Sequence, residues 1–292
     1  MASLKEIRTR ITSVQSTQKI TSAMKLVSAS KLRHAQNAII NFRPYSDKLN
    51  QILQNLSSTG VSTDHPLFAK RDTENVVIVA ITSNRGLCGA FNSNVIKEVH
   101  RVVNEEYNKQ FREGKLKLVC IGKKGIEQLQ KNHNIRYANE SLLDSPIFTE
   151  VAQIAEDLMQ DFCDKKIDRV SIIYNRFVNP ATQKIVTENF LPIVSLNDNK
   201  ITNTVTDNYI FEPSQQVLME ELILKSLKLK FYKALLDSIA SEHGARMTSM
   251  AKATDNAIEI LRELKLKYNN ARQAAITNEL NEIVSGAEAL KS

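Results

Sequence analysis

Residues 1–59 read MASLKEIRTRITSVQSTQKITSAMKLVSASKLRHAQNAIINFRPYSDKLNQILQNLSST and contain no glycine. The first glycine of the 292-residue chain is Gly60, directly after a Ser-Ser-Thr run that is typical of a helix end. Pro44 is the one residue in the stretch that should kink a helix or remove one of its hydrogen bonds. We therefore predict one N-terminal helix, roughly 87 Å long at about 1.5 Å per residue.

The apolar residues of this helix follow the 3-4 spacing of a coiled-coil seam, but the seam is interrupted over residues 15–31. In this stretch the positions expected for the seam hold polar residues, while Ile20, Met24 and Val27 form an apolar stripe beside them, the displaced stripe. Either the seam loosens locally, or this stretch faces a second partner, and the spacing favours neither interpretation. The regular seam positions are Leu4, Ile7, Ile11, Val14, Leu32, Ala35, Ile39, Phe42, Leu49, Leu53 and Leu56, and the polar ones are Gln18, Thr21, Lys25 and Ser28.

A second long helix is predicted over 213–292, where Pro213 suits the first turn and no further proline follows. The two long helices can pair antiparallel from a shared base, and the second is longer by about twenty residues, or roughly 30 Å. An apolar stripe near its end then has no partner in this chain and must be covered by something else. That stripe is Ile276, Leu280, Ile283, Ala287 and Leu290, and the seam before it is Leu218, Leu222, Leu229, Tyr232, Leu236, Ile239, His243, Arg246, Met250, Ala253, Ala257, Ile260 and Leu264.

Residues 72–212 alternate apolar strand-like runs with amphipathic segments, which predicts a small parallel-type sheet with helices on its faces. The fold class is therefore mixed (α+β). A long antiparallel two-helix coiled coil is formed by 1–59 and 213–292, and a Rossmann-like α/β domain is inserted at 72–212. The predicted strands are 75–82, 116–121, 169–174 and an edge strand at 185–192, and the predicted helices are 92–112, 122–132 and 149–165.

The sequence contains no recognisable catalytic or metal-binding motif. The turn Ser83–Ala90 lies between a strand and a helix, but it matches no common phosphate-loop pattern, and a tight turn is the better interpretation. Arg85 could lower the pKa of the nearby Cys88 thiol. The three cysteines and five histidines show no disulfide or metal spacing. We expect no catalysis by the chain itself, no cofactor and no metal.

The net charge of +7 is concentrated in residues 1–59, which hold nine Lys and Arg against Glu6 and Asp47. Such a basic stripe predicts an acidic partner: a nucleic acid, an anionic lipid or an acidic protein surface. A nucleic-acid arm is disfavoured, because the seam occupies part of the helix and aromatic residues occur only at Phe42 and Tyr45. No apolar run approaches the length of a transmembrane helix, and the first residues lack the apolar core of a signal peptide.

Three segments resemble the gamma subunits of F-type ATP synthases. They are IRTRITSVQSTQKITSAMKLVSASKL (7–32), TSNRGLCGAFN (82–92) and the tail SEHGARMTSMAKATDNA…YNNARQAAITNELNEIVSGAEAL (241–290). The resemblance covers the whole chain and is weaker through 110–205. It implies that the paired helices form the central rotor shaft inside an alpha3beta3 hexamer. The α/β domain would be a foot that rests, with the epsilon subunit, on the membrane rotor (c) ring, and delta would join only through the complex.

The implied function is the coupling of ion flow through the rotor ring to sequential conformational changes of the catalytic beta subunits. Nucleotide chemistry would belong to the beta subunits, so this chain would be a non-catalytic subunit of a hetero-oligomeric complex and would bind no nucleic acid. The implied location is peripheral, on the cytoplasmic face of the bacterial inner membrane.

The resemblance also implies roles for single residues. Beta-subunit contacts are implied for Met24 and Lys25 in SAMK, Arg246 in GARM, and Gln273 and Thr277 in RQAAIT. The stripe 276–290 would be the shaft tip in an apolar bearing. Contacts with the rotor ring and epsilon are implied for Tyr209, Phe211 and Glu212 in NYIFEP, where Phe211 replaces a tyrosine common in the family.

The residues alone leave two other classes of protein open. A Rossmann-like enzyme with coiled-coil arms should bind a nucleotide or small substrate through 72–212. A nucleic-acid-binding coiled coil should show steeply salt-dependent affinity for a duplex. We expect neither.

Overall fold

The computed structural model describes residues 4–58, 66–69, 71–144, 146–193, 212 and 214–289. These fall into two compact units: residues 29–246, and residues 1–28 together with 247–292. Both long helices are confirmed, as α1 (Leu4–Ser58) and α6 (Gln215–Ala289), and each contributes to both units. Pro44 lies inside α1 without ending it. The division into segments 1–59, 72–212 and 213–292 stays a prediction, because the compact units cut across both helices.

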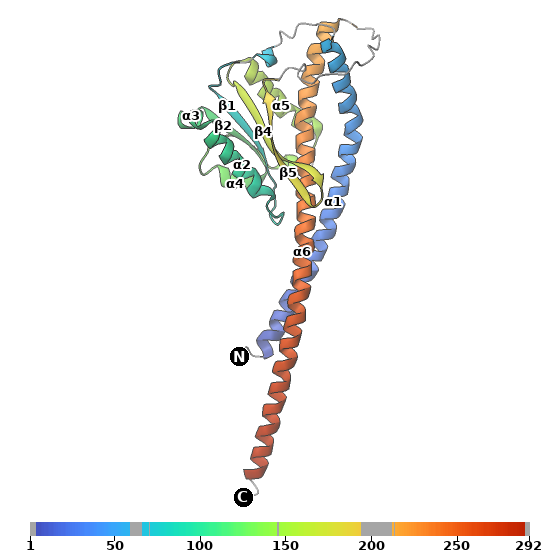
Figure 1. Ribbon diagram of the computed structural model, residues 1–292, viewed down its shortest axis with the longest axis vertical. Coiled ribbons are helices and arrows are strands. Elements are labelled where there is room, and N and C mark those ends of the chain that lie inside the picture. The colour runs from blue at the N-terminus through green and yellow to red at the C-terminus, as the bar shows by residue number, and fades with distance from the viewer. Residues whose placement is uncertain are drawn as a thin grey trace. The chain divides into compact units, whose positions relative to one another are not determined.

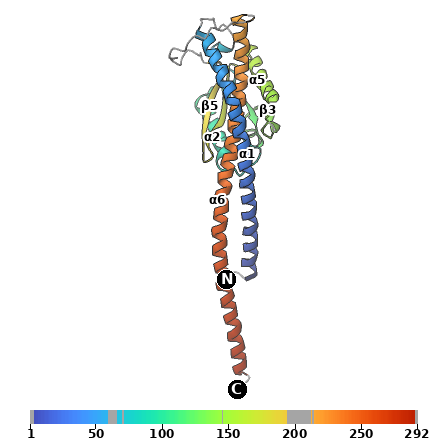
Figure 2. The ribbon, with the colours of Figure 1, turned by 90° about the vertical axis from the view of Figure 1, so that its right-hand side faces the viewer.

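Helices α1 and α6 run antiparallel and side by side (Figures 1 and 2). In the unit 29–246 the rings of Phe42 and Tyr232 meet edge to face, with centroids 5.6 Å apart. In the other unit the Thr254 hydroxyl donates to the Thr21 hydroxyl at 2.8 Å. The contact between Thr21 and Thr254 fixes the register of the two helices within this second unit. Continued to Leu4, this register places the start of α1 opposite about residue 271 of α6.

The sheet of the unit 29–246 has five strands in the order β3-β2-β1-β4-β5. The first four are parallel, and β5 pairs antiparallel with β4. The four predicted strands are confirmed. Strand β3 was not predicted, because only its first and last residues are even partly buried and no apolar run marks it. The strands are β1 (Val76–Ile81), β2 (Leu116–Ile121), β3 (Ile135–Asn139), β4 (Arg169–Asn179) and β5 (Thr182–Leu191).

Both faces of the central strand β1 are buried. Its residues Val76, Ile78 and Ala80 belong to a core that includes the apolar stripe of α2 and Leu129 of α4. The intervening residues of β1 are also buried, so neither face meets water. The predicted helix 92–112 is wrong as a single element, because the chain leaves the helix after Glu105 and starts a short one at Asn108. The helices are α2 (Phe91–Glu105), α3 (Asn108–Arg112), α4 (Lys123–Leu129) and α5 (Phe148–Cys163), with 3-10 turns η1 (Pro66–Phe68) and η2 (Ser141–Leu143).

Helix α6 is enclosed on all sides in the middle of its length. Every residue from 234 to 242 is buried, including Asp237, Ser238, Ser241 and Glu242. A helix that faces one partner buries a single stripe, so full burial requires neighbours on more than one side. In Figure 1, α1 lies along one flank of this segment and β4 and β5 lie along another.

Candidate functional site

A doubly wound sheet binds ligands where its strand order reverses, at the carboxyl ends of the strands. Here the order reverses between β1 and β4. Helix α6 crosses this point. Its Ser241 hydroxyl donates to the carbonyl of Asn175 in β4 at 2.9 Å. Farther along, Arg246 donates to the carbonyls of Arg85 and Gly86, in the turn after β1, at 3.0 and 3.2 Å. The crevice in which an α/β enzyme would hold a nucleotide is occupied by the chain's own helix.

The turn after β1 is closed by its own side chains. Asn92 accepts a hydrogen bond from the Ser83 N–H at 2.9 Å and donates to the Ser83 hydroxyl at 2.7 Å and to the Cys88 sulfur at 3.3 Å. Cys88 is only 1% exposed and packs with Phe91 and Ala245. Burial raises the pKa of the Cys88 thiol, against the lowering effects of Ser83 and Arg246. The lowered pKa that Arg85 could have produced at this thiol is therefore not found.

Arg246 anchors a buried polar cluster. Its guanidinium lies 2.8 Å from the Glu242 carboxylate, and both side chains are about a tenth exposed or less. Burial raises the pKa of Glu242, while Arg246 opposes that shift. Burial, Arg246 and Lys31 together lower the pKa of His243 to about 4. Arg246 thus has its donors directed at partners within the chain, and its implied contact with a beta subunit stays a prediction.

The interrupted part of the α1 seam is polar but remains partly packed. Thr21 and Ser28, in the seam frame, are buried, and Thr21 bonds to Thr254 of α6. The displaced stripe points away from α6: Ile20 is 60% exposed and Val27 is 57% exposed. The seam is therefore packed at Thr21 and Ser28 and loosened at Lys25, which is exposed. The alternative, a second partner for this stripe, fits the exposure. Met24 is half-buried, and Lys25 is exposed.

The end of α6 extends past α1. Ala275 is the last partly covered residue, and every residue from 276 to 287 is exposed. The predicted uncovered stripe is confirmed for Ile276, Leu280, Ile283 and Ala287, whereas Leu290 lies outside the described residues. Gln273 and Thr277 are exposed as well, and the Thr277 hydroxyl donates to the Gln273 carbonyl at 2.9 Å.

The α6 seam continues beyond Leu264, its last predicted residue. Ile260, predicted on the seam, is 46% exposed, whereas Leu261 is buried. Burial at 3-4 spacing then persists through Leu264, Tyr268, Ala271 and Ala275. A second consecutive spacing of four, from Ala257 to Leu261, was the signal for these positions, because Leu264, Tyr268, Ala271 and Ala275 then follow at 3-4 spacing.

The predicted foot contacts fall mostly outside the described part of the chain. Tyr209 and Phe211 lie outside it, and Glu212 is exposed. In the described residues, no helix is long and apolar enough to cross a membrane. That part of the chain also brings together no group of three or more His, Cys, Asp and Glu that could hold a metal ion.

Comparison with known proteins identifies the family. A family model described as ATP synthase matches residues 3–290. The ATP synthase gamma chain of Flavobacterium johnsoniae is 52% identical over 291 residues, covering 99% of both chains. That of Flavobacterium psychrophilum is 53% identical over 292 residues, covering all of both chains. A chain of the Euglena gracilis mitochondrial ATP synthase rotor, 21% identical, shares the fold with a TM-score of 0.65, covering 94% of this chain and 98% of that one.

The fold consists of an antiparallel helix pair and an α/β domain, and one of the two long helices fills the ligand crevice of that domain. This arrangement defines a mechanical rather than a catalytic class of protein. The chain belongs to the ATP synthase gamma chain family. It is a non-catalytic, central-stalk subunit of that complex.

Proposed function

We propose that the chain transmits torque between the membrane rotor ring and the catalytic beta subunits of an alpha3beta3 hexamer. The observation that carries this proposal is the uncovered apolar surface of the two long helices. Ile20 and Val27 on α1, and Ile276, Leu280 and Ile283 on α6, are each about half exposed or more. Monomeric soluble proteins rarely leave such stripes in water, which favours a surrounding protein sleeve.

Contacts of this kind suit a rotating shaft. Apolar contact is non-directional, so an apolar sleeve has no fixed hydrogen bonds to break at each step. The basic residues of α1 add charge complementarity toward acidic segments of the beta subunits, with Met24, Lys25, Arg246, Gln273 and Thr277 as the proposed contacts. The epsilon subunit and the rotor ring would meet the foot near Tyr209, Phe211 and Glu212, and delta would join only through the complex.

The energies are consistent with distributed contacts. Each ion that crosses the membrane delivers about 2.3 kcal/mol per 100 mV. Inverting a 1:99 conformational equilibrium in a beta subunit takes about 5.5 kcal/mol of differential binding. One exposed ion pair supplies at most ~1 kcal/mol, so many contacts along the shaft must share the task. The chain would act as a peripheral subunit on the cytoplasmic face of the bacterial inner membrane.

Reconstitution tests this function. The chain is combined with alpha, beta and epsilon subunits and with rotor-ring membranes, and ATP hydrolysis and ATP-driven proton uptake are measured together. We expect coupled uptake that disappears when the chain is omitted. A complex that pumps equally well without it would contradict the proposal.

A further inference from the structure

A basic pocket lies on the sheet domain, apart from both long helices. It has a volume of about 380 Å³ and is lined by eight residues at the amino-terminal ends of the strands. All of its charged lining residues are cations, and Val76, Val77 and Ile167 supply the apolar lining. The volume falls within the roughly 300–1,000 Å³ typical of small-molecule sites. The lining consists of Asn75, Val76, Val77, Lys115, Lys117, Arg136, Lys166 and Ile167.

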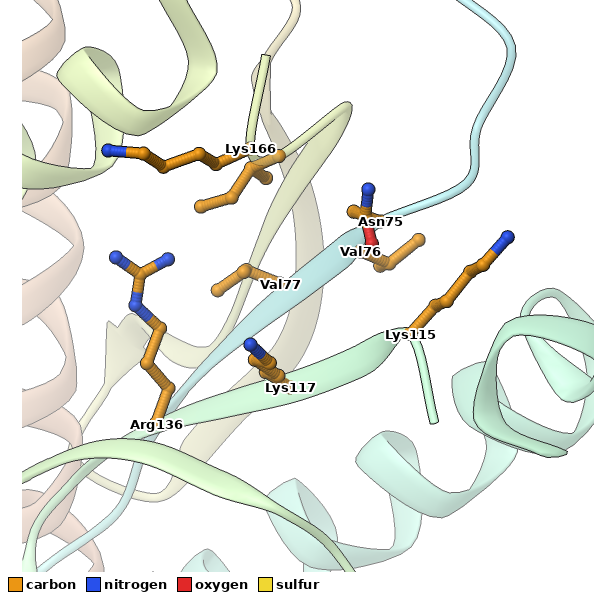
Figure 3. Close-up of a pocket in the computed structure, with 8 residues that line it drawn as sticks. Asn75, Val76, Val77, Lys115, Lys117, Arg136 and Lys166 are labelled. Atoms are coloured by element: carbon orange, nitrogen blue, oxygen red, sulfur yellow. The ribbon is translucent and has the colours of Figure 1, made fainter. Parts of the chain in front are cut away.

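Three of the cations surround Val77, whereas Lys115 extends away at the other end of the pocket (Figure 3). Lys117 is the Cα partner of Val77 and the one exposed residue of β2. Lys115 is engaged by Glu74 at 3.1 Å and by Glu113 at 3.3 Å. The cluster that faces the pocket is therefore Lys117, Arg136 and Lys166.

An irregularity of the sheet places Arg136 in this cluster. In β2, Leu118 and Val119 are consecutive, yet their partners in β3 are Ile135 and Tyr137. Arg136 is thus the extra residue of a β-bulge. Bulges re-aim side chains and are common beside binding sites, which gives a second observation, independent of the charge, that points to the same pocket.

The cluster has more positive charge than its carboxylate partners balance. Arg136 pairs with Asp161, which also lies 3.4 Å from Lys166, and Lys166 lies 3.0 Å from Asp164. Asp168 accepts hydrogen bonds from the backbone N–H groups of Glu74 and Asn75 instead. Among the residues that the structure describes, Lys117 has no ion-pair partner. Lys117 is therefore a cation without a carboxylate partner in the described structure, beside the apolar lining of the pocket.

We propose that this pocket binds a phosphate group, held by Lys117 and Lys166 as point charges and by the planar fork of Arg136. Guanidinium groups recognise phosphate through two parallel hydrogen bonds, and ammonium groups add charge-assisted ones. The phosphate comes either from a free anion or from an anionic lipid headgroup, and both share this chemistry. The site is separate from the torque-bearing surfaces.

The test uses the purified full-length chain and two probes. Sodium pyrophosphate is titrated while backbone amide signals are followed by NMR, and binding to phosphatidylglycerol vesicles is compared with binding to phosphatidylcholine vesicles. Lys117→Gln is the main variant, because Lys117 has no ion pair within the described structure whose loss would disturb folding. Lys97→Gln is the matched control: it removes the same charge from an exposed position on α2.

We expect saturable pyrophosphate shifts centred on β2, the β3 bulge and Lys166. Lys117→Gln should weaken binding about tenfold, the effect of losing one hydrogen bond to a charged group, while Lys97→Gln binds as the parent does. Binding to phosphatidylglycerol alone, with the same dependence on Lys117, assigns the phosphate to a lipid. No saturable binding of either probe, or equal weakening by both variants, would overturn the proposal.

Discussion

The guanidinium of Arg246 donates a hydrogen bond to the carbonyl oxygen of Gly86 at 3.2 Å, although 160 residues separate them in the chain. Together with the bond to the Arg85 carbonyl, this contact fastens α6 to the turn after β1. Glu242, one helical turn earlier, provides the carboxylate that makes burial of the cation tolerable.

Breaking this cluster should destabilise the isolated chain. Arg246→Gln leaves the Glu242 carboxylate buried without its cation, a change that costs about 3–5 kcal/mol. The double variant Arg246→Gln/Glu242→Gln removes both charges and should regain a large part of that loss. Urea unfolding of the two variants and the parent measures the difference. If Arg246→Gln leaves the stability of the chain unchanged but impairs ATP turnover in the assembled complex, Arg246 acts in the beta-subunit contact and not in the buried cluster.

Asp237 should give the chain a measurable pH dependence. Burial raises the pKa of Asp237 to about 6, while Lys233, Arg176 and Arg43 oppose the shift. The folded state therefore binds this proton more tightly than the unfolded state does, since the ordinary pKa is 3.8. The resulting stability is complete below pH 3.8 and is lost as the pH rises through about 6.

Asp237→Asn should remove that pH-dependent loss and leave the chain more stable than the parent at neutral pH, by up to about 3 kcal/mol. Thermal unfolding of both chains between pH 4 and pH 8 checks this. Asp255→Asn, at an exposed position of the same helix, is the control and should follow the parent. If the stabilities of Asp237→Asn and the parent change in parallel with pH, the pKa of Asp237 is not raised in the folded chain.

Two glycines should differ in how much an added methyl group destabilises the chain. Gly122 has a φ of +100°, and a Cβ there would lie 2.6 Å from the backbone oxygen of Thr82. Gly122→Ala should therefore cost about 2 kcal/mol or more. A Cβ on Gly86 meets nothing within 4 Å, so Gly86→Ala should stay within about 0.5 kcal/mol of the parent. Equal melting temperatures for the two variants would contradict the steric difference between Gly122 and Gly86.

The tip of α6 should be dynamic until a partner covers it. Since every side chain from 276 to 287 is exposed, a helical end without packing should fray. We expect fast amide exchange over 276–292 in the isolated chain and strong protection in the complex, measured by mass spectrometry. Leu280→Asp should leave the isolated chain unchanged but harm assembly more than Gly86→Ala does. Protection of the tip in the isolated chain would show that the stripe is covered without a partner.

Met24 tests the displaced stripe on α1. Met24→Lys adds a cation beside the exposed Ile20 and Val27. It should reduce the number of protons pumped per ATP hydrolysed by more than it reduces hydrolysis. Gln15→Lys adds the same charge at an exposed position on another face of the helix and serves as the control. An unchanged pumping ratio in Met24→Lys would remove Met24 from the coupling contact.

The periodicity of the sequence predicted the features that arise within a single helix or strand. The long helices, four of the five strands and the overhang at 276 follow from local spacing and from helix length. The enclosure of residues 234–242 could not be read in this way, because Asp237, Ser238, Ser241 and Glu242 mimic a solvated face. Their burial depends on where the sheet lies in space. The same limit applies to Arg246, whose partners Arg85 and Gly86 have no sequence signal that points to α6.

Helix α6 limits the chemistry available to this domain, because it occupies the crevice between β1 and β4. A segment fixed by the same chain competes with free molecules at an effective concentration that commonly reaches the millimolar range or more. Ser241 and Arg246 are such tethered competitors, at Asn175 within β4 and at Gly86 in the turn after β1. Helix α6 therefore blocks ligand binding in this crevice from within the chain. A nucleotide could enter only after α6 was withdrawn, whatever residues were introduced into the turn.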